Sequence, residues 1–158
     1  MRHVFLVAAL VLLAASKCFA AGSSSEQALQ ELIKAKDFKC MLKSGYQVKF
    51  DGSSVDGRES EFSSNPEDST INFAQLDLIK GTALLVGNAG SSPLEVFVGE
   101  TGLTFLEKTD NGNIVVYKIF ANKYDRKYFF VNSRHPQISA AITISLPSQY
   151  YGSCKITN

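Results

Sequence analysis

The chain has 158 residues, of which 45% are hydrophobic, with 16 basic and 15 acidic residues. This length suits one domain with a sizeable core. The balanced charge gives no electrostatic reason to expect nucleic acid or an anionic membrane as a partner.

The first twenty residues have the pattern of a secretory signal peptide. Arg2 supplies a positive start, residues 4–15 carry no charge, and small residues lead to Ala20, after which we expect cleavage. An apolar run of about 12 residues is shorter than the roughly 20 that span a bilayer, which disfavours a membrane anchor. We therefore expect a signal peptide at 1–20, a single domain at 21–158, and a secreted or periplasmic protein without an integral membrane segment.

Two cysteines, Cys40 and Cys154, remain after the leader is removed. In an oxidising compartment such a pair predicts a disulfide. The alternatives are free thiols or a metal pair, and His135 is the one histidine left to complete a metal site. We expect the Cys40–Cys154 disulfide, with no metal and no other cofactor.

One helix is predicted, over residues 23–36. Ser24 and Gln27 have the spacing of a capping box. The apolar residues of the helix share one face, which is formed by Leu29, Leu32 and Ile33. We expect this face to lie against the β-structure or to close one end of it.

From Asp37 onward, apolar and polar residues alternate with the period of two that is typical of β-strands. Residues 51–68 are polar and are predicted to form a long loop. The predicted strands are 38–43, 46–50, 70–73, 82–86, 94–98, 103–108, 113–120, 127–134, 138–146 and 149–156. Many short strands with glycine turns between them indicate an all-β barrel or sandwich.

The sequence Asn-Gly at 111–112 predicts a two-residue type I′ hairpin turn. With this turn, Leu106 lies opposite Tyr117, and Glu107 and Lys118 become diagonal neighbours on the other face of the hairpin. Both faces of this hairpin are largely apolar. It is therefore covered on both sides, or it lines a lumen.

The alternation places Cys40 on the inward face of the first strand and Cys154 on the inward face of the last. A bond between them needs Cα atoms within about 7 Å. A closed up-and-down barrel brings first and last strands together and removes exposed edges. The barrel is therefore favoured, with the β-sandwich as the alternative.

Arg134 shares a face with Phe130, and His135 takes the opposite face. An inward Arg134 needs an anion, either Glu107 or a ligand carboxylate. The alternative is an arginine in water that caps carbonyls or pairs with Asp125.

No catalytic motif is found, because His135 has no nucleophile elbow to partner it. The glycines Gly87 and Gly90 lack the lysine and helix of a phosphate loop. Tyr150 belongs either to a binding rim or, like most such tyrosines, to the core.

Three segments, 101–109, 133–135 and 147–154, carry a resemblance. They resemble a group of small exported bacterial proteins without an assigned activity, which are similar to calycins, the lipocalin-like and fatty-acid-binding-like barrels. This resemblance implies a barrel of about 8–10 strands with one N-terminal helix. The chain has no tryptophan, so the Gly-x-Trp signature of true lipocalins is missing, and the resemblance supplies no ligand.

The function expected is an exported, non-enzymatic binding protein that holds a small apolar or amphipathic molecule in the barrel. The candidate ligand-binding residues are Arg134, Glu107, Lys118 and Tyr150. The alternative is a protein–protein interaction or inhibitor module that acts through its loops, at 51–68 and 122–127.

Overall fold

The computed structural model describes residues 24–50, 55–61, 69–87, 90–110, 112–139 and 143–157. The predicted signal peptide, residues 1–20, lies outside the described residues. Within the described part of the chain, no helix is long and apolar enough to cross a membrane.

Among the described residues, one helix, at 24–34, precedes the strands. The strands are β1 (Phe38–Phe50), β2 (Val55–Glu61), β3 (Thr70–Asp77), β4 (Thr82–Gly87), β5 (Gly90–Gly99), β6 (Gly102–Lys108), β7 (Ile114–Tyr124), β8 (Lys127–Arg134), β9 (Gln137–Ser139), β10 (Thr143–Ser145) and β11 (Ser148–Ile156). Their pairings are all antiparallel. The all-β prediction with one N-terminal helix is confirmed.

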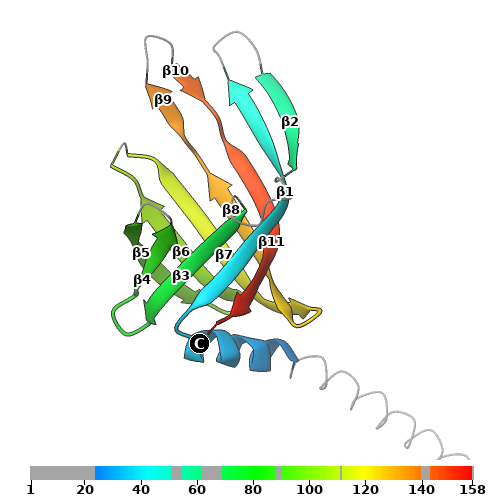
Figure 1. Cartoon of the computed structure of the whole chain (residues 1–158), viewed down its shortest axis with the longest axis vertical. Coiled ribbons are helices and arrows are strands. Elements are labelled where there is room, and N and C mark those ends of the chain that lie inside the picture. The colour runs from blue at the N-terminus through cyan, green and yellow to red at the C-terminus, as the bar shows by residue number, and fades with distance from the viewer. Residues whose placement is uncertain are drawn as a thin grey trace, which may run out of the picture.

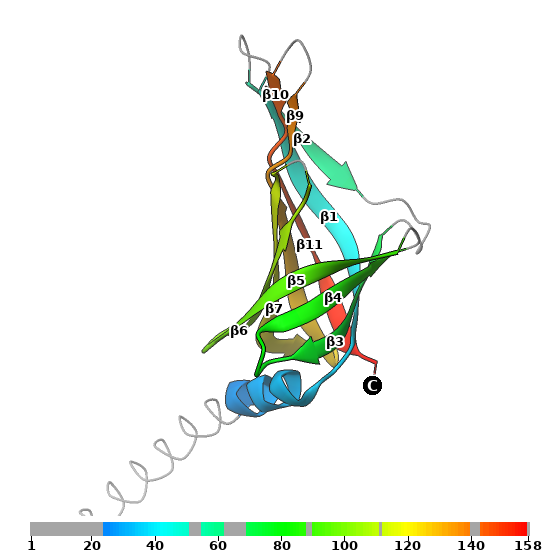
Figure 2. The ribbon, with the colours of Figure 1, turned by 90° about the vertical axis from the view of Figure 1, so that its left-hand side faces the viewer.

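Eight of these strands close into an up-and-down barrel, in the order β1-β11-β8-β7-β6-β5-β4-β3 and back to β1 (Figure 1). Closure follows because β1 pairs with β11 along most of its length and with β3 near its start. Outside the ring, β2 pairs with the far half of β1, and β9 pairs with β10 (Figure 2). The barrel prediction is therefore confirmed, and the sandwich alternative is wrong.

The disulfide joins the two strands that close the ring. Cys40 on β1 lies directly opposite Cys154 on β11, with Cα atoms 3.9 Å apart, and the two form a disulfide. Both cysteines are fully buried on the inward face, as the alternation predicts.

Aromatic rings occupy the barrel interior towards the helix end. Phe73 stacks on Phe105 with ring centroids 4.5 Å apart, and it meets Tyr117 and Phe130 edge-on at 5.3 and 6.0 Å. Phe38 completes this group with an edge contact to Phe105. Such rings bury large apolar areas in favourable geometries, so they stabilise this half of the barrel as a packed core.

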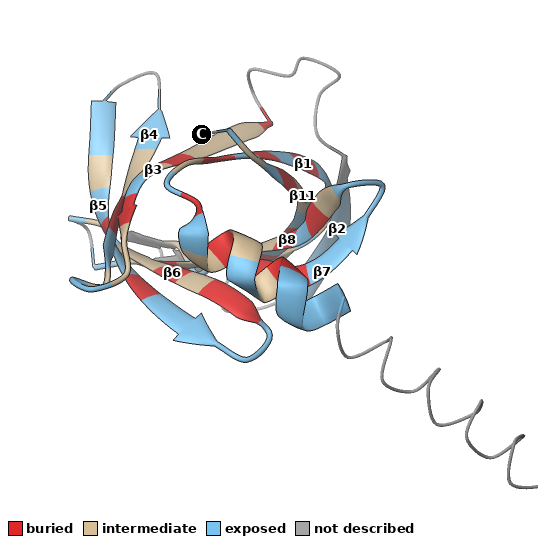
Figure 3. Cartoon of the chain, turned by 90° about the horizontal axis from the view of Figure 1, so that it is seen from below, coloured by how far each residue is buried: buried red, intermediate tan, exposed pale blue. Residues whose placement is uncertain are grey.

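The helix lies across one end of the barrel (Figure 3). The buried residues of the helix and of the position just after it recur every three or four positions as one stripe, formed by Ala28, Leu32 and Ala35. On its other flank, Glu31 accepts hydrogen bonds from Lys123 and, at 2.7 Å, from the Tyr128 hydroxyl. Burial and this bond to Glu31 raise the pKa of Tyr128 to about 12, so the phenol remains a donor. The helix therefore closes this end, as predicted.

The Ser44-Gly45 step does not end a strand, contrary to the prediction. β1 runs through it, with a register shift between Leu42 and Ser44. A Cβ on Gly45 would lie 2.1 Å from Cδ1 of Tyr150, so a glycine is needed because the Tyr150 ring covers the backbone here.

Two other element predictions also need correction. The polar segment 51–68 contains β2, which lies outside the barrel ring and so lacks the apolar alternation of a core strand. The predicted strand 138–146 is instead two short strands, β9 and β10, and residues 140–142 lie outside the described residues.

The hairpin between β6 and β7 has a longer loop than the two-residue turn predicted. Thr109 and Asn113 pair with each other, so three residues separate them, and the Gly112 N–H donates to the Thr109 carbonyl at 2.9 Å. Gly112 has a φ of 77°, the left-handed conformation typical of the last residue in a three-residue loop. A turn with two consecutive positive φ values occurs instead at Asp125 and Arg126, at 51° and 59°.

The extra loop residue shifts the register by one position. Phe105, not Leu106, lies opposite Tyr117. A shift of one residue exchanges the two faces of a strand, so Glu107 joins the inward face while Lys118 lies on the outward face. The prediction that Glu107 and Lys118 are neighbours on one face is therefore wrong.

Candidate functional site

Polar side chains gather inside the barrel at the end opposite the helix. Across β6, β7, β8 and β11, the strand register aligns Glu107, Val115, Arg134 and Ser148. The next inward row, one step deeper, is Phe105, Tyr117, Asn132 and Tyr150. We name the polar members of both rows the mouth cluster: Glu107, Tyr117, Asn132, Arg134, Ser148 and Tyr150.

Within the mouth cluster, Tyr117 and Glu107 form a fixed pair. The Tyr117 hydroxyl donates to Oε2 of Glu107 at 2.7 Å. Burial, and then the nearby Glu107 carboxylate, raise the pKa of Tyr117 far above its usual value, while the Arg134 charge opposes this shift. The phenol therefore stays protonated, and it orients the carboxylate at the mouth.

Asn132 is the most unusual member of the mouth cluster. Its side chain is 4% exposed, and Oδ1 has no hydrogen-bond partner. An unpaired buried amide oxygen costs about 1–3 kcal/mol, so such groups call for an explanation. Its neighbours across the strands are Tyr117 and Tyr150. The sequence indicates the unusual position of Asn132, because the alternation along β8 puts this polar residue on the same face as Phe130.

Arg134 has the inward register but is exposed at the rim. The alternative prediction, that Arg134 pairs with Asp125, is wrong. The eight-residue strand β8 lies between these two residues and separates them by roughly 25 Å, at about 3.3 Å per residue. Among the described residues, Arg134 has no ion pair. Its guanidinium therefore remains available to an anion at the mouth.

The other three candidates divide between the two faces. Glu107 belongs to the mouth cluster, and Tyr150 is buried there at 8% exposure. Lys118 lies outside the barrel, where Nζ donates to Oγ1 of Thr104 at 3.2 Å and lies 5.8 Å from the Phe120 ring centre. The structure thus brings Arg134, Glu107 and Tyr150 together and leaves Lys118 apart.

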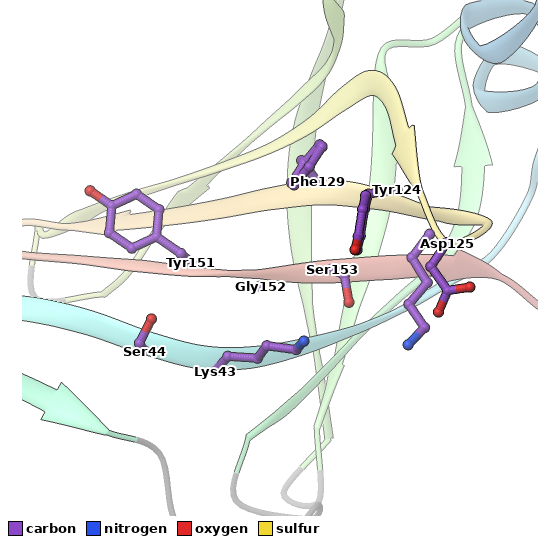
Figure 4. Close-up of a pocket in the computed structure, with 9 residues that line it drawn as sticks. Lys43, Ser44, Tyr124, Asp125, Phe129, Tyr151, Gly152 and Ser153 are labelled. Carbon is purple, nitrogen blue, oxygen red and sulfur yellow. The ribbon is translucent and has the colours of Figure 1, made fainter.

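A hollow lies on the outer surface, where β1, β11 and β8 run side by side (Figure 4). It is a groove of about 260 Å³ near the turn between β7 and β8. Its lining includes Lys43, Lys127, Asp125, Phe129 and Tyr151. This groove is separate from the mouth cluster, because its residues come from outward faces and from the turn.

Over the described ranges, no group of three or more histidine, cysteine, aspartate or glutamate side chains is arranged to hold a metal ion. The chain matches no protein-family model and none of the curated proteins compared with it.

Proposed function

We propose that this chain is an exported, non-enzymatic binding protein that takes one small amphipathic molecule at the mouth cluster. The observation that carries the proposal is the buried, unpartnered Oδ1 of Asn132. A ligand hydroxyl or N–H at this position supplies the missing donor and removes the desolvation cost. Eight-stranded barrels are of a size that either fills with side chains or holds one small ligand at the mouth.

The neighbours of Asn132 define the chemistry of the ligand. Arg134 at the rim favours a carboxylate or a similar anionic group. The rings of Tyr117 and Tyr150 and the side chain of Val115 provide apolar contacts between the rim and Asn132. The ligand we propose has an anionic end at the rim, an apolar body, and a hydrogen-bond donor that reaches Asn132.

Binding is proposed rather than catalysis because of the types of group present. The mouth cluster offers an amide, a guanidinium and a carboxylate that already accepts a phenol hydrogen bond. These groups recognise polar partners, and an activated nucleophile would need a base oriented beside it.

The competing hypothesis is an interaction or inhibitor module that acts through loops. Of its proposed contact segments, 51–68 forms β2 at residues 55–61, and the rest of that segment lies outside the described residues. The segment 122–127 comprises the end of β7, the turn at Asp125 and Arg126, and the start of β8, and it exposes 74% of Tyr124, which offers one contact point for a protein partner.

Native mass spectrometry of protein purified from its own host tests the proposal. We expect an adduct of roughly a few hundred daltons, which is lost on extraction with organic solvent. Two variants, Asn132→Leu and Arg134→Gln, should lose the adduct. The first removes a buried hydrogen bond to the ligand and the second a charged one, and each loss should weaken binding by roughly 10- to 100-fold. Lys118→Gln is the matched control, because it removes a charge from the outer face of the same barrel wall.

The stability of the variants separates binding from folding. Asn132→Leu should unfold at an unchanged or higher temperature without ligand, because it removes an unpaired buried oxygen. Retention of the adduct by both mouth variants would show that the ligand binds elsewhere. A wild-type protein without any adduct would favour the interaction module instead.

A further inference from the structure

Basic residues concentrate on one outer face of the barrel, although the whole chain is nearly neutral. This face is formed by the outward side chains of β1, β11 and β8 and by the turn before β8. We name it the basic face, and its cations are Lys39, Lys43, Arg126, Lys127 and Lys155. The acidic side chain among them is Asp125, in the groove of Figure 4.

Two of these lysines are direct cross-strand neighbours. Lys39 on β1 lies opposite Lys155 on β11, next to the disulfide-bonded pair. Like charges directly opposite each other are destabilising in a sheet. The arrangement is therefore a cost to the folded protein, and binding of an anion to this face would offset it.

Among the described residues, the cations of the basic face have no ion pair, whereas several lysines elsewhere do. Lys80 pairs with Asp77 and Lys108 with Glu95. Across the part of the chain that the structure describes, none of the five cations of the basic face has such a partner.

Apolar and aromatic side chains alternate with these cations. Met41, Ser153 and Phe129 occupy one cross-strand row, and the two large side chains are 40% and 46% exposed. Tyr151 and Tyr124 add rings that are 46% and 74% exposed. Large side chains exposed together on a sheet mark a surface that binds another apolar phase or partner.

The groove in this face results from the irregularity in β1. The register shift between Leu42 and Ser44 inserts Lys43 as an extra residue, and a bulge of this kind redirects the side chains beside it. Gly152 opposite allows the close approach, since a Cβ there would lie 2.0 Å from the Met41 carbonyl oxygen. As a result, Lys43 and Lys127 line the same hollow.

We propose that the basic face docks the protein peripherally on an anionic lipid surface. The lysines and Arg126 contact headgroup phosphates, and the groove holds one headgroup between Lys43 and Lys127. Met41 and Phe129 reach the apolar layer beneath, while the tyrosines lie at headgroup depth. A free acidic polymer matches the charges of this face but offers no apolar layer to Met41 and Phe129. A lipid surface matches both the cations and the apolar side chains of the basic face.

Vesicle co-sedimentation tests this proposal independently of the mouth cluster. The probes are equimolar phosphatidylcholine–phosphatidylglycerol vesicles and pure phosphatidylcholine vesicles, with the full chain in its disulfide-bonded form. We expect binding to the anionic vesicles alone, and its loss as salt rises from about 0.01 M to about 1 M, because exposed charges are screened.

The variants assign the binding to the basic face. Lys43→Gln with Lys127→Gln should weaken binding about 25-fold, at about 1 kcal/mol or fivefold per lysine near the surface. The control is Lys80→Gln with Lys108→Gln, which removes the same charge elsewhere and should change binding less than about twofold. All four lysine side chains are at the surface or partly so, and thermal unfolding verifies that both double variants are folded.

Several outcomes would overturn the proposal. One is the absence of binding to the anionic vesicles at low salt. Another is equal binding by the two double variants, which would assign the effect to net charge or to the apolar residues 4–15. Binding to single-stranded DNA or an acidic polysaccharide without binding to vesicles would identify a soluble polyanion as the partner instead.

Discussion

Removal of the Cys40–Cys154 bond measures how much of the stability depends on the covalent link rather than on the closed ring. The cysteines are 114 residues apart in the sequence. For a loop of this length, the loss of chain entropy in the unfolded state gives about 4.8 kcal/mol of stabilisation at 25 °C. β1 and β11 keep their ladder, from Phe38 opposite Ile156 onward, without the sulfur bridge, so the folded state changes little.

The assay is equilibrium unfolding in urea, followed by circular dichroism. It compares the oxidised wild type, the same protein after reduction and refolding, and the variant with Cys40→Ala and Cys154→Ala. Alanine is chosen because both positions are fully buried, and a serine hydroxyl would be left without a partner there. We expect a free energy of unfolding lower by about 4–5 kcal/mol in the last two samples, with a larger m-value because the open chain exposes more surface.

A loss below about 1 kcal/mol with an unchanged m-value would refute this reasoning. Such a result would mean that the unfolded chain keeps its ends together without the bridge, so that the covalent link removes little entropy. A different outcome is that the double variant loses as much free energy of unfolding as the reduced wild type does and also shows an altered circular dichroism spectrum. That combination would assign the loss to disturbed packing at the two cysteine positions.

Two further predictions concern the backbone and the helix. Gly102→Ala should destabilise the barrel by more than about 2 kcal/mol, because its φ is 132° and a Cβ would lie 2.0 Å from a neighbouring carbonyl oxygen. Gly87→Ala is the control, since a Cβ there meets nothing within 4 Å, and a loss equal to that of Gly102→Ala in thermal unfolding would contradict the steric explanation. Hydrogen bonds from Lys123 and Tyr128 lower the pKa of Glu31 below its usual 4.5, so this carboxylate stabilises the fold above that pH, and the contribution is lost as the pH falls through the lowered value. In Glu31→Gln, the free energy of unfolding, measured by urea titration, should therefore depend less on pH below about 4.5. Parallel curves of free energy against pH for the wild type and the variant would contradict this.

The residues of the mouth cluster were only partly predictable. The period of two along β8 correctly places Arg134 and Asn132 on one face with Phe130, because side-chain alternation is a local property of an extended chain. The alternation alone leaves open whether this face points into the barrel. The significance of Asn132 could not be read in this way, since it depends on the partners that β7 and β11 provide. Glu107 was grouped with Lys118 instead of Tyr117, because the loop length could not be fixed from the Asn-Gly pair alone.

The disulfide and the ring closure were within reach of the sequence. Two inward-facing cysteines, one in the first and one in the last strand, imply neighbouring strands, and the barrel meets this condition. The basic face was not within reach, because net charge sums over the whole surface. Five cations distributed between residues 39 and 155 become one face only when β1, β11 and β8 lie side by side.

The sequence by itself thus determined the local properties: most of the extended segments, which side chains share a face within one strand, and the position of the helix at residues 24–34. The tertiary structure decided the relations between strands, namely the register of β6 and β7, the meeting of Glu107 with Tyr117, and the gathering of lysines outside the barrel. The physical reason is that alternation follows from the geometry of a single strand. Register and strand order depend instead on loop lengths and on packing across the barrel, which residues distant in the sequence settle together.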